Sequence, residues 1–215
     1  MEKIITKILV LASGRGSNFR ALCEAVRSNE IPNARIVGLI TNNKEAPALD
    51  IAETFKIPSA VIDSDRYRID KKLDRAAYEK DLLITAERFS PDLVCLAGYM
   101  LLIGPELTRR YRLRMVNIHP SLLPQFKGLR AQKQALEAGA TTTGCTVHLV
   151  TEELDGGPIL LQKSIVILAE DTEDTLSARL LPIEHAAYVE AVAKLCSGKK
   201  MRIENNQVFF NDGQR

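Results

Sequence analysis

Short apolar runs bounded by turn residues recur along this chain, and their spacing constrains its fold more than any other feature. The first run covers residues 8–12 and ends at Ser13-Gly14, the pattern of a strand that is buried on both faces. Similar runs follow at residues 36–40, 60–62, 93–97 and 115–118. Stretches of helical period separate them, and the clearest places four residues on one stripe, namely Tyr78, Leu82, Thr85 and Phe89. This alternation predicts an α/β fold with a mostly parallel sheet and helices on both faces.

The pattern changes from about Gly144 onwards. Residues 146–150 alternate between polar and apolar side chains, a turn follows, and residues 159–167 form a second extended segment. Two strands this close along the chain cannot be joined by a crossover helix, so we expect an antiparallel pair. The predicted fold is therefore a Rossmann-like, mostly parallel sheet with an antiparallel C-terminal part.

The remaining residues predict one long helix and a short hairpin. The helix covers residues 176–195, with Thr172 as its N-cap and acidic residues in its first turn. Pro182 lies inside this helix and should either kink or divide it. Residues 201–210 are expected to form a hairpin around Asn205-Asn206. Because no Gly/Ser/Pro-rich linker interrupts the sequence, we expect a single domain.

Charge and cysteine usage exclude several classes of function. Among the 215 residues, 29 Lys and Arg oppose 27 Asp and Glu, and the net charge of +2 is too small to indicate a nucleic-acid or membrane partner. The four cysteines are widely spaced, which argues against a zinc ribbon or a dithiol motif and fits a reducing compartment. The longest apolar stretch is far short of the ~20 residues that a membrane span needs. We also expect no signal peptide, and therefore a cytoplasmic protein.

A glycine-containing loop follows the first predicted strand. Its sequence is Ser13-Gly14-Arg15-Gly16-Ser17-Asn18, and the carboxyl end of a strand is where open α/β sheets bind ligands. Glycines let the backbone approach an anion, and the following helix presents unpaired N–H groups to it. The loop lacks the third glycine of a dinucleotide fingerprint and the Gly-Lys pair of a Walker loop. It fits a single phosphate, although a tight turn with Ser17 as the helix N-cap is the alternative.

Two further strings carry groups suited to acid–base chemistry. Asn117 and His119 lie two apart on or just past a strand, so both point to one face and can converge on a developing oxyanion. The alternative is a strand-end histidine bonded to a backbone carbonyl. Asp155 precedes Gly156 and Gly157 in what could be a plain turn. If that loop folds over the same sheet edge, Asp155 could hold His119 in its charged form or relay a proton.

Together these strings resemble the glycinamide ribonucleotide transformylases, the folate-dependent formyltransferases of purine biosynthesis. The likeness runs from about Lys7 to Gly198. It is carried by the segments 13–18, 96–100 (Leu-Ala-Gly-Tyr-Met), 117–124 (Asn-Ile-His-Pro-Ser-Leu-Leu-Pro), 144–148 (Gly-Cys-Thr-Val-His), 154–158 (Leu-Asp-Gly-Gly-Pro) and Glu184-His185. The proline-rich string and the Asp-Gly pair belong to the wider formyltransferase family, whereas the phosphate loop and the compact length point to this member.

The resemblance implies a reaction and its catalytic residues. The amine of glycinamide ribonucleotide attacks the formyl carbon of 10-formyltetrahydrofolate and gives a tetrahedral intermediate. Asn117 and His119 would stabilise its oxyanion, while Asp155 would pair with His119 and help move a proton from the amine to the departing folate nitrogen. The chemistry implied needs no metal. The implied partners are these two small molecules, with no nucleic acid and no membrane, acting on a monomer or homodimer.

The resemblance also implies binding residues and a division of the chain. The nucleotide would contact the phosphate loop, Gly16, Ser17 and Asn18, together with Glu184. Folate would contact Arg75, Met100, Leu101, Leu102, Ile103, Asn117, Thr151, Glu152, Glu153, Leu154 and Asp155. Residues 1–215 would form one formyltransferase domain, with a nucleotide phosphate-binding half over about 1–112, a folate-binding and catalytic part over about 113–198, and a short tail, 199–215.

Two departures and three alternatives accompany this interpretation. The family usually has Arg where Leu101 stands, and it often has His where this chain reads Leu129 to Gln132. A methionyl-tRNA formyltransferase shares the Asn-x-His-Pro string but carries a further tRNA-binding domain, and few residues follow Gly198 here. A formyltetrahydrofolate hydrolase normally has an additional N-terminal regulatory domain. A catalytically silent folate- or phosphate-binding protein is the third alternative. His148 is interpreted as structural, because it alternates with apolar neighbours.

Overall fold

The fold is described from a computed structural model in which residues 5–211 are placed. The chain divides into two compact units, one ending at Val116 and the other beginning at Asn117. Among the described residues, no helix is long and apolar enough to cross a membrane.

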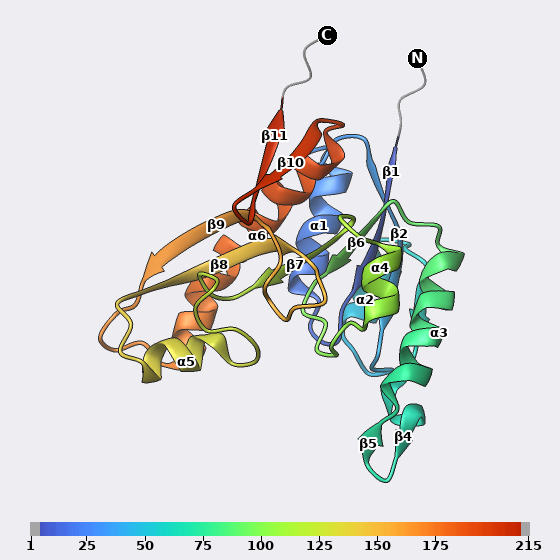
Figure 1. The fold of residues 1–215 in the computed structure, drawn as a ribbon, viewed down its shortest axis with the longest axis horizontal. Helices are drawn as coiled ribbons and strands as arrows, with labels where there is room; N and C mark the ends of the chain where they lie inside the picture. Colours follow the sequence, from blue (N-terminus) through green and yellow to red (C-terminus); the bar gives the residue numbers. More distant parts are fainter. Residues whose placement is uncertain (1–4, 212–215) are drawn as a thin grey trace. The chain divides into compact units, whose positions relative to one another are not determined.

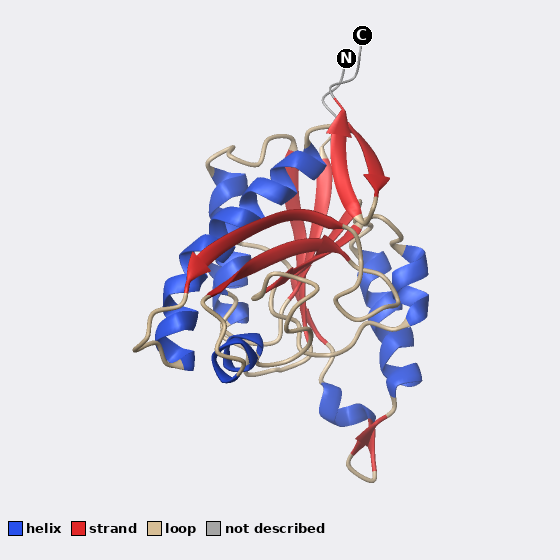
Figure 2. Ribbon diagram, turned by 60° about the vertical axis from the view of Figure 1, so that its left-hand side comes forward, coloured by secondary structure: helices blue, strands red, loops and turns tan. Residues whose placement is uncertain are grey.

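The first unit is an open parallel sheet with helical connections. Its elements are β1 (Thr6–Leu11), α1 (Ser17–Arg27), β2 (Ala34–Thr41), α2 (Ala48–Thr54), β3 (Ser59–Val61), the 3₁₀ helix η1 (Ser64–Tyr67), β4 (Arg68–Ile69), β5 (Lys72–Leu73), α3 (Arg75–Arg88), β6 (Leu93–Leu96) and α4 (Pro105–Arg110). The parallel strands follow the order β6-β1-β2-β3 (Figure 1). The apolar run at residues 8–11 is fully buried in β1, a central strand that lies between β2 and β6 in a sheet with helices on both faces (Figure 2).

The strand order of this unit reverses beside β1. From β1 the chain moves outwards to β2 and β3, and it then returns to place β6 on the other edge of β1. Because such crossovers are right-handed, the reversal places α3 on the face opposite α1 and α2, so that helices flank both sides of the strands (Figure 2). The loops after β1 and β6 leave the sheet at this reversal, where open α/β sheets form ligand crevices.

The small hairpin β4–β5 was not predicted from the sequence. It joins η1 to α3 and projects at the start of α3 (Figure 1). Asp70 and Lys71 form its turn at φ 49° and 66°. Its strands are two residues long and mostly exposed, so no alternation of apolar and polar side chains marks them.

The second unit carries the antiparallel part of the fold. Its elements are β7 (Met115–His119, which spans the boundary), α5 (Ala131–Glu137), β8 (Thr142–Leu149), β9 (Ile159–Val166), α6 (Glu173–Cys196), β10 (Lys200–Glu204) and β11 (Gln207–Asn211). The strand order is β10-β11-β9-β8-β7, and β8 pairs with β9 in antiparallel register. The predicted fold class, a mostly parallel sheet with an antiparallel C-terminal part, is confirmed.

The predicted helix and hairpin at the C-terminus are both present. Thr172 caps α6 in a capping box with Thr175, as the sequence predicts for the N-cap. The helix continues through Pro182 and is not divided there. Its buried side chains pack against β8 and β9. The hairpin β10–β11 turns at Asn205-Asn206, and both asparagines have positive φ, as a tight two-residue turn requires.

Candidate active site

The loop after β1 makes a tight entry into α1. Gly16 occupies the N-cap position with φ 72°, and a Cβ there would lie 2.8 Å from the Cβ of Ala48, so the close packing of α2 requires glycine. Ser17 is the first helical residue, and no side chain caps this helix end. The alternative interpretation of Ser17 as N-cap is therefore wrong. Asn18 is buried in the first turn, while Ser17 is half-buried.

The loops after β1 and β6 are joined through Ser13. Its backbone N–H donates to Gly98 O at 3.1 Å, and its hydroxyl accepts from the Met100 N–H at 2.8 Å. These bonds place the predicted phosphate loop beside the start of the predicted folate segment, residues 100–103. Met100 is 59% exposed, and Leu102 is also exposed, so this segment presents apolar side chains to solvent.

Two tyrosines fasten the loop after β6 to α3. The hydroxyls of Tyr78 and Tyr99 hydrogen-bond, and Tyr67 packs edge-on against Tyr78 with ring centroids 5.3 Å apart. Burial raises the pKa of Tyr78 to about 12. Arg75, another predicted folate residue, is the exposed first residue of α3, one turn before Tyr78.

The second unit brings four polar side chains together at the ends of β7 and β8. Asn117 and His119 come from β7, His148 from β8, and Asp155 from the loop between β8 and β9. The two histidines and Asp155 are 5%, 3% and 9% exposed. His119 Nδ1 lies 3.5 Å from Asp155 Oδ2, and His148 Nε2 lies 3.6 Å from Asp155 Oδ1. The sequence predicted three members of this cluster and interpreted the fourth, His148, as structural.

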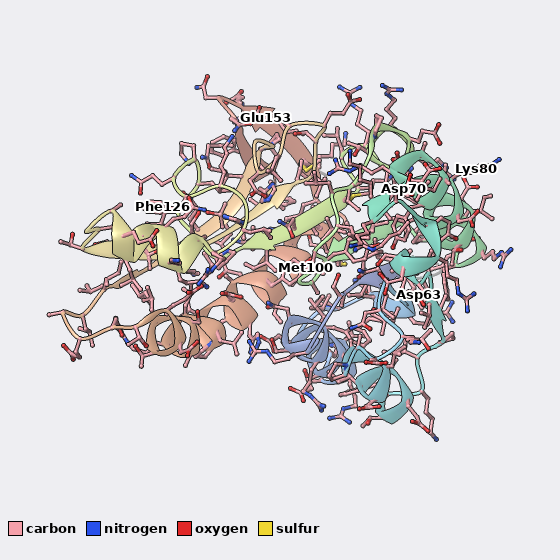
Figure 3. All side chains as sticks on the ribbon, turned by 90° about the horizontal axis from the view of Figure 1, so that it is seen from below. Asp63, Asp70, Lys80, Met100, Phe126 and Glu153 are labelled. Carbon is pink, nitrogen blue, oxygen red and sulfur yellow. The ribbon has the colours of Figure 1, made fainter. Side chains whose placement is uncertain are left out.

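His119 also contacts a backbone carbonyl. Its Nε2 lies 2.9 Å from the carbonyl oxygen of Phe126, which belongs to the loop between β7 and α5 (Figure 3). Both nitrogens of the ring therefore face acceptors, since the Asp155 carboxylate lies on the other side. The contact with a backbone carbonyl that was the alternative for His119 is therefore present, and the ring also lies beside the Asp155 carboxylate.

His148 orients Asn117. Its Nδ1 lies 3.0 Å from Leu149 O and donates to it, which leaves Nε2 as an acceptor for the Asn117 amide at 3.2 Å. Burial lowers the pKa of His148, and the neighbouring Asp155 carboxylate opposes that shift. The neutral ring is the form that accepts from Asn117, so burial and hydrogen bonding favour the same state.

The loop that carries Asp155 is shaped by close backbone contacts. Asp155 itself has φ 47°, a left-handed conformation that aspartate tolerates better than most residues. A Cβ on Gly157 would lie 1.9 Å from Leu149 O, so glycine is required there. Asp155 Oδ2 accepts the Gly128 N–H at 2.8 Å. These contacts hold the Asp155 carboxylate in a defined place, which a plain turn would not do.

Five other predicted binding residues belong to the second unit, four in the same loop as Asp155 and one on α6. Thr151, Glu152, Glu153 and Leu154 lie in the loop between β8 and β9, where Glu153 (Figure 3) pairs with Lys127 at 2.7 Å. Glu184 is a buried residue of α6. Among residues 5–211, no group of three or more His, Cys, Asp or Glu is arranged to hold a metal ion.

The chain is similar to known proteins over nearly its whole length. The formyl transferase family model matches residues 6–192. Phosphoribosylglycinamide formyltransferase of Escherichia coli is 36% identical over 208 residues, which cover 97% of this chain and 94% of that protein. The structure of glycinamide ribonucleotide transformylase 1 from Symbiobacterium toebii superposes with a TM-score of 0.91 at 37% identity, covering 98% of this chain and 96% of that one.

Some relatives are much longer than this chain. Trifunctional purine biosynthetic protein adenosine-3 of Bos taurus is 41% identical over 204 residues, which are 95% of this chain but 20% of that protein. The chain thus spans about a fifth of the length of this relative. With the family model covering most of the sequence, the chain belongs to the formyl transferase family. The resemblance inferred from the motifs is confirmed at that level.

Proposed function

We propose that this chain transfers the formyl group of 10-formyltetrahydrofolate to the amine of glycinamide ribonucleotide, giving formylglycinamide ribonucleotide and tetrahydrofolate in de novo purine biosynthesis. The observation that carries the proposal is the cluster formed by the half-buried Asn117 with the buried His119, His148 and Asp155, in a chain of the formyl transferase family. Such a cluster combines donors for an oxyanion with a carboxylate that can take a proton.

Formyl transfer needs these two functions. A bond forms between the amine nitrogen and the formyl carbon, the bond from that carbon to folate N10 breaks, and a proton moves from the amine to N10. Asn117 has two amide hydrogens, and because His148 accepts one, the other remains to bind the developing oxyanion. The ring of His119 supplies a second donor. Asp155 stabilises positive charge on that ring and assists the proton transfer.

Binding of the two substrates is assigned to several loops. In the first unit, Gly16, Ser17 and Asn18 would bind the nucleotide phosphate, while Arg75 and residues 100–103 would bind folate. In the second unit, residues 151–155 would also contact folate, and Glu184 the nucleotide. The chain would act as one formyltransferase domain with the division proposed from the sequence, as a monomer or homodimer in the cytoplasm, and without a metal.

The departures from the family pattern affect the folate side. Leu101 is half-buried and carries no charge, so a folate carboxylate gains nothing from this position. The backbone of residues 100–103 is unaffected by that change and can still offer hydrogen bonds to a planar ring. Gln132 is a half-buried residue near the start of α5.

The test is absorbance-monitored loss of formyl from a 10-formylfolate analogue, with and without glycinamide ribonucleotide. Turnover that requires the nucleotide supports the proposal. Deformylation without it would identify a hydrolase, and folate binding without any turnover would identify a silent binder or a different acceptor. The His119→Ala variant, purified in parallel, shows how much of the signal comes from contaminating enzymes.

A further inference from the structure

The loop between β7 and α5 contacts both acid–base groups of the proposed site. The carbonyl oxygen of Phe126 lies 2.9 Å from His119 Nε2, and the Gly128 N–H donates to Asp155 Oδ2 at 2.8 Å. A displacement of this loop would therefore move the partners of His119 and Asp155 together.

The Phe126 position is not the relaxed one. Phe126 has φ 54°, in the left-handed region that is unfavourable for an L-residue with a bulky side chain. Such a conformation persists only where surrounding contacts determine it. The Phe126 carbonyl that contacts His119 therefore depends on other contacts of the loop to hold its position.

Thr146 supplies part of the restraint. It is fully buried on β8, and its hydroxyl donates to Ser121 O at 2.7 Å while it accepts from the Leu123 N–H at 3.0 Å. The Ser121 hydroxyl in turn hydrogen-bonds the Gln125 carbonyl, the residue before Phe126, at 2.6 Å. One threonine hydroxyl therefore fixes two backbone groups at the start of the loop.

Gln162 completes this restraint from β9. Thr146 and Gln162 are direct partners in the β8–β9 ladder. The Gln162 amide nitrogen lies 2.9 Å from Leu123 O and 2.9 Å from Thr146 Oγ1, so each of its two hydrogens has an acceptor. With the Gln162 bond, the Thr146 hydroxyl donates one hydrogen bond and accepts two, which is the full number that a hydroxyl can make.

We propose that Gln162 is a positioning residue. Acting through Thr146 and the backbone of residues 121–125, it holds the Phe126 carbonyl against His119 Nε2. Nε2 then keeps its proton, which it donates to the Phe126 carbonyl. The ring atom left to interact with the reacting oxygen is therefore Nδ1, on the side of Asp155. In the charged ring Nδ1 also carries a proton, and its separation of 3.5 Å from Asp155 Oδ2 leaves that Nδ1 proton available to a substrate oxygen. This inference rests on the proposed function only for the identity of the reacting oxygen.

The first test needs no substrate, so its failure is distinct from a failure of formyl transfer. The ¹⁵N signals of the His119 ring, assigned by comparison with His119→Ala, report which nitrogen carries hydrogen. The proposal predicts that Nε2 is protonated throughout the pH range in which the protein is folded. A neutral ring with its hydrogen on Nδ1 would overturn the proposal whatever the enzyme's activity.

The second test removes the restraint. Gln162→Met keeps the side-chain length but not the amide, and Gln162→Glu keeps the shape but not the donor. Both should lower kcat about tenfold or more by misplacing the ring, with KM changed by less than about twofold. Gln207→Met, at an exposed position of β11, is the matched control and should keep wild-type kcat.

A purely structural role for Gln162 predicts a different result. It would lower thermal stability or the folded fraction while the His119 Nε2 signal of the folded protein stayed as in the wild type. That pattern, or an unchanged kcat, would overturn the proposal. If Gln162→Met does not fold, the comparison moves to Thr146, where Thr146→Val should lose far more kcat than Thr146→Ser because serine keeps the hydroxyl.

Discussion

The Nδ1 atom of His119 lies 3.5 Å from Oδ2 of Asp155, and the same carboxylate oxygen accepts the Gly128 N–H at 2.8 Å. Asp155 is therefore held by the backbone and presented to the ring, rather than positioned by the ring. Its other oxygen faces His148 at 3.6 Å. A buried carboxylate between two histidines, fixed by one hydrogen bond, can stabilise a positive charge on either ring.

Asp155→Asn should lower kcat by about 10²–10⁴-fold while changing either KM little, since general acid–base catalysis typically contributes that much. Asparagine keeps the volume of the side chain and an acceptor for Gly128, but it cannot take a proton or stabilise a charged His119. Steady-state kinetics with both substrates varied give the two constants. Near-wild-type turnover in this variant would remove Asp155 from the mechanism.

Replacing Ser17 and Asn18 together by alanine should raise KM for glycinamide ribonucleotide about tenfold or more, because each hydrogen bond to a charged group contributes about 1.5–3 kcal/mol. KM for the folate donor should stay the same. Arg20→Ala, an exposed change one turn further along α1, is the control for a nonspecific effect on the helix. An equal loss of affinity for both substrates would argue against a phosphate loop.

Much of the fold was accessible from the sequence because its signals are local. The apolar run at residues 8–12, the glycines after it and the capping residue Thr172 each act within a few residues of themselves. His148 was interpreted as structural because it alternates with apolar neighbours. Its contact with Asp155 depends on the loop between β8 and β9, which brings Asp155 back to it seven positions later.

Other contacts had no sequence signal at all. The partner of His119 Nε2 is the carbonyl of Phe126, and a carbonyl is present at every residue whatever its type. Gln162 reads as one polar residue of an extended segment until the ladder places it against Thr146. These contacts are set by register and loop conformation, which local patterns do not determine.

The lowered pKa of His148 should make the protein less stable in mild acid. An unfolded histidine titrates near 6.5, whereas burial holds the folded pKa below that value. Between the two values the unfolded chain binds more protons than the folded one, so the contribution is fully present above about pH 6.5 and is lost as pH falls towards the folded pKa. One such group changes the free energy of unfolding by at most about 1.4 kcal/mol per pH unit.

Urea unfolding between pH 7.5 and 5 checks this, with His148→Gln as the comparison. Glutamine does not titrate, so its stability should fall less steeply over that range. Asp155, His119 and Lys127 act on the His148 charge and remain in both proteins. If the free energy of unfolding falls with pH in parallel for the wild type and the variant, another group causes the loss of stability in acid.

Native thiols should resist alkylation. Cys23, Cys95, Cys145 and Cys196 are all buried, and none of the four forms a disulfide bond. Burial raises the pKa of Cys23 and of Cys145 to about 12, so little thiolate exists at neutral pH, and the thiolate is the reactive form. Intact-mass analysis after iodoacetamide treatment should find unlabelled native protein, and the same reagent in guanidinium chloride should add four labels. Rapid labelling of one native cysteine would contradict the prediction and would locate a part of the fold that opens more readily than its burial implies.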